Sequence, residues 1–260
     1  AGRFAAPVPL LDTMAVAAPL LRDVGHTAPL AAIAKGEARV AVGLSGTYLL
    51  GAAEADLLLL VRDGALHGVR HADTTLEAEP SIDGARHLAR VRWTPKPETL
   101  LASEGAAVQP LADAFDRGAL GASAELLGLA QRMIEIAVEY AKVRKQFGAP
   151  IGSFQAVKHH LASALLKVEF ARPAVYRAAY SMAQNDPERS VHVSMGKACA
   201  GDAATHAARA ALQCHGAIGY SFEHDLHLWM KRAWALAAAW GHADWHRARV
   251  ATAILGQEES

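Results

Sequence analysis

The sequence has no excess charge of either sign, no long apolar run and no leader-like start. Its 26 Lys and Arg residues balance 26 Asp and Glu residues, so it lacks the basic footprint of a protein that binds nucleic acid or an anionic membrane. No stretch of about 18 apolar residues occurs, and the first residues lack the order of a signal peptide. We therefore expect a cytoplasmic protein with neither nucleic acid nor a membrane as a partner.

Cysteine is scarce, and the histidines offer no complete metal site. Cys199 and Cys214 are the two cysteines, both in Ala-rich surroundings with a helical pattern, so we expect reduced thiols and no disulfide. Two histidine pairs have spacings that a metal could use on a helix: His224 with His227, and His242 with His246. Neither pair is part of a recognisable ligand set, so solvated or interface histidines are favoured and no metal is predicted.

The first part of the chain divides into a short helical segment and a β region. Residues 1–35 contain two helical patterns, at 9–21 and 29–35, which are too short to form a core alone. Residues 36–104 change to strand-like runs with Asp-Gly turn signals at 63–64 and 83–84, which predict a small antiparallel β domain. The predicted strands cover residues 39–44, 55–62, 66–71 and 89–93.

The rest of the chain is predicted to be helical. Residues 95–105 contain two prolines with little periodicity and are predicted to form a linker. Five helices should follow within residues 105–260. The first ends near 148, the second has Ser153 as its N-cap and runs to about 184, and the others cover about 188–214, 223–237 and 242–255. Long helices with short connections indicate a bundle, so the fold class is mainly α with a small β domain.

Two segments at helix ends carry the most specific sequence signals. Residues 144–151 read Arg-Lys-Gln-Phe-Gly-Ala-Pro-Ile, and residues 213–220 read Gln-Cys-His-Gly-Ala-Ile-Gly-Tyr. Taken alone, Arg144 could simply be a cation at a helix C-terminus, and the second segment could be a C-cap turn with Gly216 or Gly219 at positive φ. The length of the first pattern and the spacing between the two segments favour a more specific role than helix termination.

Both segments resemble signatures of the acyl-CoA dehydrogenase family. The resemblance covers residues 118–256, along the family's C-terminal helical domain, and implies a reduced β domain and a truncated N-terminal helical part here. In that family the first segment reaches across a dimer interface to the FAD of the neighbouring subunit, which implies cofactor-binding roles for Arg144, Gln146 and Phe147. A guanidinium suits a pyrophosphate because it offers a fork of donors.

The second segment resembles the family's other contact to the neighbour's FAD, near the ADP half. The resemblance implies cofactor-binding roles for Gln213, His215 and Gly216. The family usually has a second glycine where this chain has Ala217, which weakens the expectation of close backbone approach there.

The family's catalytic glutamate has no counterpart in this sequence. Dehydrogenation of an acyl thioester at Cα and Cβ needs a carboxylate that removes the α-proton. In the usual register the position of that Glu is occupied by Trp240, followed by Gly241, and in a minority register it falls near Gly118. Two carboxylates remain as unconventional candidates: Glu125, about 10 Å of helix rise from the minority position, and Asp244, one turn beyond Trp240. No catalytic residue is therefore assigned.

The β region lacks the flavin-holding segment of full-length members, which has the form Thr-Glu-x-x-x-Gly-Ser-Asp. Residues 41–46 run almost directly into residues 52–56. The resemblance is therefore to the base-lacking subunit of actinobacterial α2β2 dehydrogenases that act on steroid-CoA side chains. It implies an FAD shared with a base-bearing partner subunit, and electron-transfer flavoprotein as the electron acceptor. Two alternatives stay open: a self-sufficient flavoenzyme with an unconventional base, or a structural helical protein with a vestigial site.

Overall fold

The computed structural model describes residues 1–6, 11–44, 46 and 48–256, which group into two compact units. One unit contains residues 7–118, and the other combines residues 1–6 with residues 119–260. The long helix α3 (Glu104–Val143) passes from the first unit into the second. The division into segments 1–35, 36–104 and 105–260 stays a prediction.

The unit of residues 7–118 is built on two sheets that share one core. The first sheet has the order β1-β3-β4-β7, and the second has the order β2-β6-β5. Buried Leu49, Leu58, Val69 and Val91 come from both sheets and pack in one cluster. The strands are β1 (Val40–Gly43), β2 (Tyr48–Leu50), β3 (Leu57–Arg62), β4 (Ala65–Arg70), β5 (Thr75–Glu79), β6 (Leu88–Arg92) and β7 (Leu100–Ala102).

The structure confirms four predicted strands and corrects several details of the β region. β1, β3, β4 and β6 lie where strands were expected, and Asp63 and Gly64 form a tight turn with φ of 51° and 73°. β1 pairs with β3 in parallel, so the domain is not wholly antiparallel. The predicted linker at residues 95–105 was wrong, because it contains a 3-10 turn, the strand β7 and the start of α3. Strands β2, β5 and β7 were not predicted.

Short helices precede this β region, as the sequence indicated. A π-helical segment, η2 (Leu11–Ala17), continues into α1 (Ala18–Asp23), and α2 (Leu30–Lys35) follows after a turn. The Thr13 hydroxyl donates to the Val40 carbonyl at 3.0 Å, which ties η2 to β1. Residues 9 and 10 of the first predicted helix lie outside the described residues.

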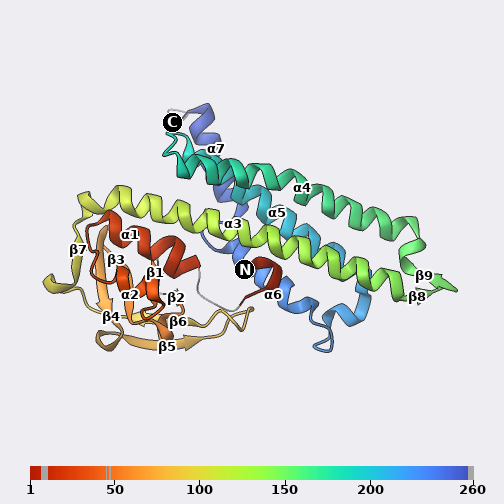
Figure 1. Ribbon diagram of the computed structural model, residues 1–260, viewed down its shortest axis with the longest axis horizontal. Helices are drawn as coiled ribbons and strands as arrows, with labels where there is room; N and C mark the ends of the chain where they lie inside the picture. The colour runs from red at the N-terminus through yellow and green to blue at the C-terminus, as the bar shows by residue number, and fades with distance from the viewer. Residues whose placement is uncertain (7–10, 45, 47, 257–260) are drawn as a thin grey trace. The chain divides into compact units, whose positions relative to one another are not determined.

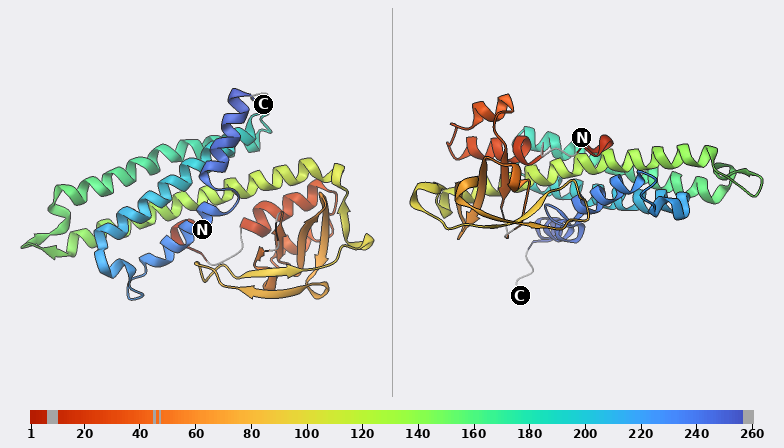
Figure 2. Two further views of the ribbon diagram at one scale, coloured as in Figure 1. Left: turned by 180° about the vertical axis from the view of Figure 1, so that it is seen from behind. Right: turned by 90° about the horizontal axis from the view of Figure 1, so that it is seen from below.

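The helical unit contains the five predicted helices. After α3 come α4 (Gln155–Ala183), α5 (Arg189–His215), α6 (Leu226–Ala238) and α7 (Ala243–Leu255), and α4 lies alongside α5 (Figures 1 and 2). The predicted Ser153 cap was wrong: Ser153 donates to the Pro150 carbonyl, and α4 begins after Phe154 without a side-chain cap. Within the described residues, no helix is long and apolar enough to cross a membrane.

Candidate cofactor-contacting surface

The first sequence motif forms a tight hairpin directly after α3. Strand β8 (Lys145–Gln146) pairs with β9 (Ala149–Pro150), and Phe147 and Gly148 make the two-residue turn. Both turn residues have positive φ, 51° and 80°, as a type I′ turn requires. Phenylalanine is strained in this conformation, and the residue is 94% exposed, so the turn holds an apolar side chain in solvent at a cost in backbone strain.

The second motif forms the end of α5 and the short 3-10 segment η7 (Gly216–Tyr220). Gly216 stops the helix with φ 65° and ψ −141°, a conformation that is open to glycine and strained for other residues. Gly219 does not have positive φ, but a Cβ atom there would lie 2.8 Å from Leu212 Cδ1. The two glycines therefore serve different purposes, one conformational and one steric.

A ring stack brings the two motifs to the same end of the bundle. Tyr140, one turn before Arg144 on α3, stacks on His215 of α5 with ring centroids 4.4 Å apart. The His224 ring contacts the His215 ring edge-on, with centroids 4.6 Å apart. The end of α3, from which the hairpin β8–β9 continues, thus contacts the end of α5 although about 65 residues separate the two motifs along the chain.

His215 itself points into the protein. Its Nδ1 donates to the Ala211 carbonyl at 2.7 Å, so Nε2 is an acceptor, and this buried atom has no hydrogen-bond partner among the described residues. Burial lowers the pKa of the imidazole, so the ring is neutral near pH 7. His215 can support the adjacent surface, but its ring does not reach outward as the other predicted residues do.

The other predicted residues face solvent. Arg144, Gln146, Phe147, Gln213 and Gly216 are all exposed. Arg144 has no ion-pair partner within the described part of the chain, because nearby Glu139 instead contacts Arg132 at 3.7 Å. This end of the bundle therefore presents a fork of cationic donors, an amide and an apolar ring, a donor set that fits the diphosphate and adenine of a dinucleotide.

Comparison with known proteins shows the family of this chain. Residues 108–255 match the family model described as acyl-CoA dehydrogenase, C-terminal domain. The chain belongs to the acyl-CoA dehydrogenase family. It is 33% identical over 233 residues to "Acyl-CoA dehydrogenase IpdE2" of Mycobacterium tuberculosis, covering 89% of this chain and 68% of that protein. It is 39% identical over 194 residues to "Acyl-CoA dehydrogenase FadE34" of the same organism, covering 73% of this chain and 26% of that protein.

Solved structures show the same fold. A glutaryl-CoA dehydrogenase in complex with glutaryl-CoA matches with a TM-score of 0.87 at 20% identity, covering 98% of this chain and 77% of that one. A ChsE4–ChsE5 complex from Mycobacterium tuberculosis matches with a TM-score of 0.85 at 23% identity, covering 98% and 78%. The acyl-CoA dehydrogenase fold is therefore established for this chain, which spans about three quarters of the length of these two structures.

The loop between α6 and α7 contains the position predicted for the family's base. Trp240 has φ 56°, and its half-buried ring packs on the cluster of Ala119, Ala178 and Val193. The two unconventional base candidates lie elsewhere: the Asp244 side chain is 86% exposed and pairs with Arg247 at 2.8 Å, while Glu125 lies on α3. Trp240 thus joins a packed apolar cluster.

Two buried polar side chains, not anticipated from the sequence, hold this loop. Lys197 of α5 is 1% exposed, and its ammonium donates to the carbonyls of Ala237 at 3.0 Å and Gly241 at 2.9 Å. His246 is fully buried and bonds the Trp240 carbonyl at 2.8 Å. The sequence indicated this role only through a single lysine in an Ala-rich helix, because the carbonyls that Lys197 contacts lie 40 and 44 residues away along the chain.

The histidines of the two pairs were expected to be solvated or at an interface, which is wrong for His246, because this residue is fully buried. The His242 ring accepts from the Trp245 amide and caps α7, and His246 bonds the loop and Ser194. No group of three or more metal-ligating side chains occurs within the described residues. The two cysteines are free, Cys199 exposed and Cys214 buried.

Gly216→Ala should destabilise the end of α5. The positive φ of Gly216 is strained for alanine, and we expect a loss of about 1–3 kcal/mol of unfolding free energy, measured by urea denaturation. Gly201→Ala is the control on the same helix, because a Cβ atom there meets nothing within 4 Å. That control should be neutral or stabilising by up to about 1 kcal/mol. Equal effects of the two substitutions would contradict the strain argument.

Lys197 should give the stability a specific pH dependence. Burial lowers its pKa from 10.5 to about 8. Between these values the unfolded chain binds more protons than the folded chain, so the contribution of Lys197 to stability rises with pH, by at most about 1.4 kcal/mol per pH unit. We expect the unfolding free energy of the natural chain to rise relative to Lys197→Met from about pH 8 to 10.5. A pH-independent difference would show that burial does not perturb this lysine.

Proposed function

We propose that this chain is a non-catalytic, FAD-contacting subunit of a heteromeric acyl-CoA dehydrogenase. The observation that carries the proposal is the outward-facing surface at the end of the bundle. A strained, exposed Phe147 and an unpaired Arg144 follow the end of α3, and exposed Gln213 and Gly216 lie at the end of α5, which α3 contacts through Tyr140. Strain of this kind persists where function requires it, and cationic donors beside an exposed ring suit a cofactor held mainly by another subunit.

The chain's own residues would bind and orient the cofactor. The Arg144 guanidinium would donate to diphosphate oxygens, Gln213 would hydrogen-bond the adenosine half, and Phe147 would pack against the cofactor and exclude water. Gly216 leaves the backbone free of a Cβ atom where the cofactor approaches. When bound, FAD supplies the acceptor for the hydride that leaves the β-carbon of the acyl thioester.

A partner subunit would supply the base. Trp240 packs in an apolar cluster, and its side chain cannot act as a general base. In the β region, only four residues separate the end of β1 at Gly43 from the start of β2 at Tyr48. This short connection supports the predicted loss of a flavin-holding segment. The similar ChsE4–ChsE5 structure is a complex of two proteins, which supports a two-protein arrangement here. Electron-transfer flavoprotein is the proposed electron acceptor, and a steroid side-chain CoA is the proposed substrate class.

Flavin content tests the proposal directly. The chain is purified alone and after co-expression with the base-bearing subunit, and absorbance near about 450 nm is measured with the subunit ratio. Flavin in a defined heterotetramer, with none in the isolated chain, is the expected result. Flavin in the isolated chain would identify a self-sufficient enzyme, and flavin in neither sample would identify a structural protein.

Arg144→Ala should weaken FAD retention in the complex and leave the bundle folded. A charge-assisted contact of this kind contributes about 1.5–3 kcal/mol, so FAD should dissociate roughly 10- to 150-fold more readily. Lys142→Ala is the matched control, because it removes an exposed cation from the same helix end outside the motif. Unchanged flavin affinity in the Arg144 variant would remove the main support for a diphosphate contact.

Trp240→Glu should not create dehydrogenase activity in the isolated chain, because this chain is also predicted to lack the flavin-holding segment. Steady-state acyl-CoA oxidation by the isolated variant is the measurement.

In the complex, Asp244→Asn and Glu125→Gln should leave acyl-CoA turnover within about threefold, whereas loss of a general base lowers it by about 100-fold or more. Steady-state acyl-CoA oxidation with FAD still bound is the measurement. A hundredfold fall for either carboxylate variant would assign the base to this chain.

A further inference from the structure

The buried imidazole of His215 lies between the two sequence motifs and contacts three elements of the helical unit. Tyr140 of α3 stacks on it, with the ring planes 21° apart. The His224 ring, in the turn before α6, meets it edge-on, and Ala211 of its own helix accepts its Nδ1 proton. The ring cluster of Tyr140, His215 and His224 therefore connects the ends of α3 and α5 with the start of α6.

The ring cluster has no acceptor for a second proton on His215. Its Nε2 atom is buried and has no hydrogen-bond partner among the described residues, so a proton there would be a buried donor left unbonded. The Nδ1 lone pair of His224 already accepts the Leu226 amide at 3.2 Å, so the neutral His224 ring carries its own proton on Nε2. Within the described part of the chain, no carboxylate forms an ion pair with His215.

Burial outweighs the groups that favour a charged imidazole. The flat Tyr140 ring and the Ala211 carbonyl both attract an imidazolium. The pKa of His215 is nevertheless lowered from 6.5, first by burial and further by His224. A hydrated imidazole therefore takes up a proton more readily than the buried one, and acid favours an opened ring cluster over a closed one.

We propose that His215 is a positioning residue that makes the cofactor contact of this chain sensitive to pH. The neutral imidazole holds the ends of α3 and α5 together, and uptake of one proton opens the ring cluster and separates Arg144 from Gln213 and Gly216. This role rests on the proposed function, because it requires both motifs to contact one FAD. Affinity for FAD is then full above about pH 6.5 and falls below it by at most about tenfold per pH unit.

The test is the FAD dissociation constant of the co-purified complex, measured from about pH 8 to about pH 5. His215→Phe keeps a flat ring against Tyr140 but takes up no proton. We expect the natural complex to lose about three- to tenfold more affinity over this range than the variant does. His215→Gln, which is also uncharged at every pH, should behave in the same way if the larger phenyl ring disturbs packing.

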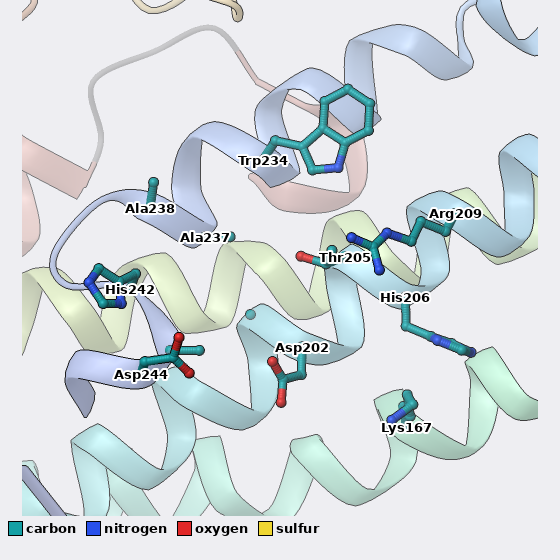
Figure 3. A pocket seen from close by; sticks show the side chains of 12 residues that line it. Lys167, Asp202, Thr205, His206, Arg209, Trp234, Ala237, Ala238, His242 and Asp244 are labelled. Carbon is teal, nitrogen blue, oxygen red and sulfur yellow. The ribbon is translucent and has the colours of Figure 1, made fainter. Parts of the chain in front are cut away.

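His206→Gln is the matched control on the same helix. Burial and nearby cationic side chains also lower the pKa of His206, but this residue lies about 13 Å of helix rise before His215. Figure 3 shows its side chain in a pocket of about 590 Å³ that Lys167 and Arg209 also line. The control should keep the pH dependence of the natural complex.

The outcomes separate a pH-dependent role from a structural one. The same pH dependence in the natural and His215→Phe complexes, or its loss in His206→Gln, would overturn the proposal. An affinity that His215→Phe lowers equally at every pH would show a purely structural role and would also overturn it.

Failure of the proposed function gives a different result, because the complex would then hold no flavin at any pH. Hydrogen exchange in the isolated chain tests the ring cluster without flavin. At the same acidic pH, amides in residues 140–146 and 211–220 should exchange faster in the natural chain than in His215→Phe. Equal exchange in the two chains would show that protonation does not open the ring cluster.

Discussion

The helical unit depends on close packing around α5, where most of the buried residues are alanine or glycine. Ala200, Ala204, Ala207 and Ala211 are fully buried along this face. Small side chains let neighbouring helices approach closely, and they lose little conformational entropy when they are buried. This packing holds α5 in place and with it Gln213 and Gly216 at its end, while Gly216 itself terminates the helix. The surface at the end of the bundle is a consequence of helix packing deeper in the unit.

The same alanine face makes its polar exceptions meaningful. Lys197 interrupts the face, and a buried ammonium requires hydrogen-bond acceptors because desolvation of a charge is unfavourable. It finds them in carbonyls at the end of α6 and in the loop that follows. Together with His246 it holds a loop in which Trp240 and Gly241 both have positive φ. Hydrogen bonds from Lys197 and His246 to backbone carbonyls thus determine the shape of this loop.

The sequence revealed the features that depend on local chemistry. Helical periodicity located the five bundle helices, and the Asp63–Gly64 pair located a turn, because both signals arise from neighbouring residues. Strand β7 and the parallel pairing of β1 with β3 were missed, because these strands are stabilised by partners distant in the chain. The cofactor-binding role of the motif residues stays a prediction, and only the structure shows that the His215 ring turns inward. Lys197 could not be assigned a role without knowledge of the carbonyls around it.

The tight turn at Phe147 has a consequence for the strength and selectivity of the proposed assembly with a partner subunit. A flexible loop would lose conformational freedom when it docks, and this loss would weaken the association. Here strand pairing closes the two-residue turn within the chain itself, so the backbone that carries the aromatic ring is already ordered. An ordered side chain fits only a partner surface of matching shape. In the proposed complex, the hairpin would therefore discriminate against subunits whose surface does not fit the ring.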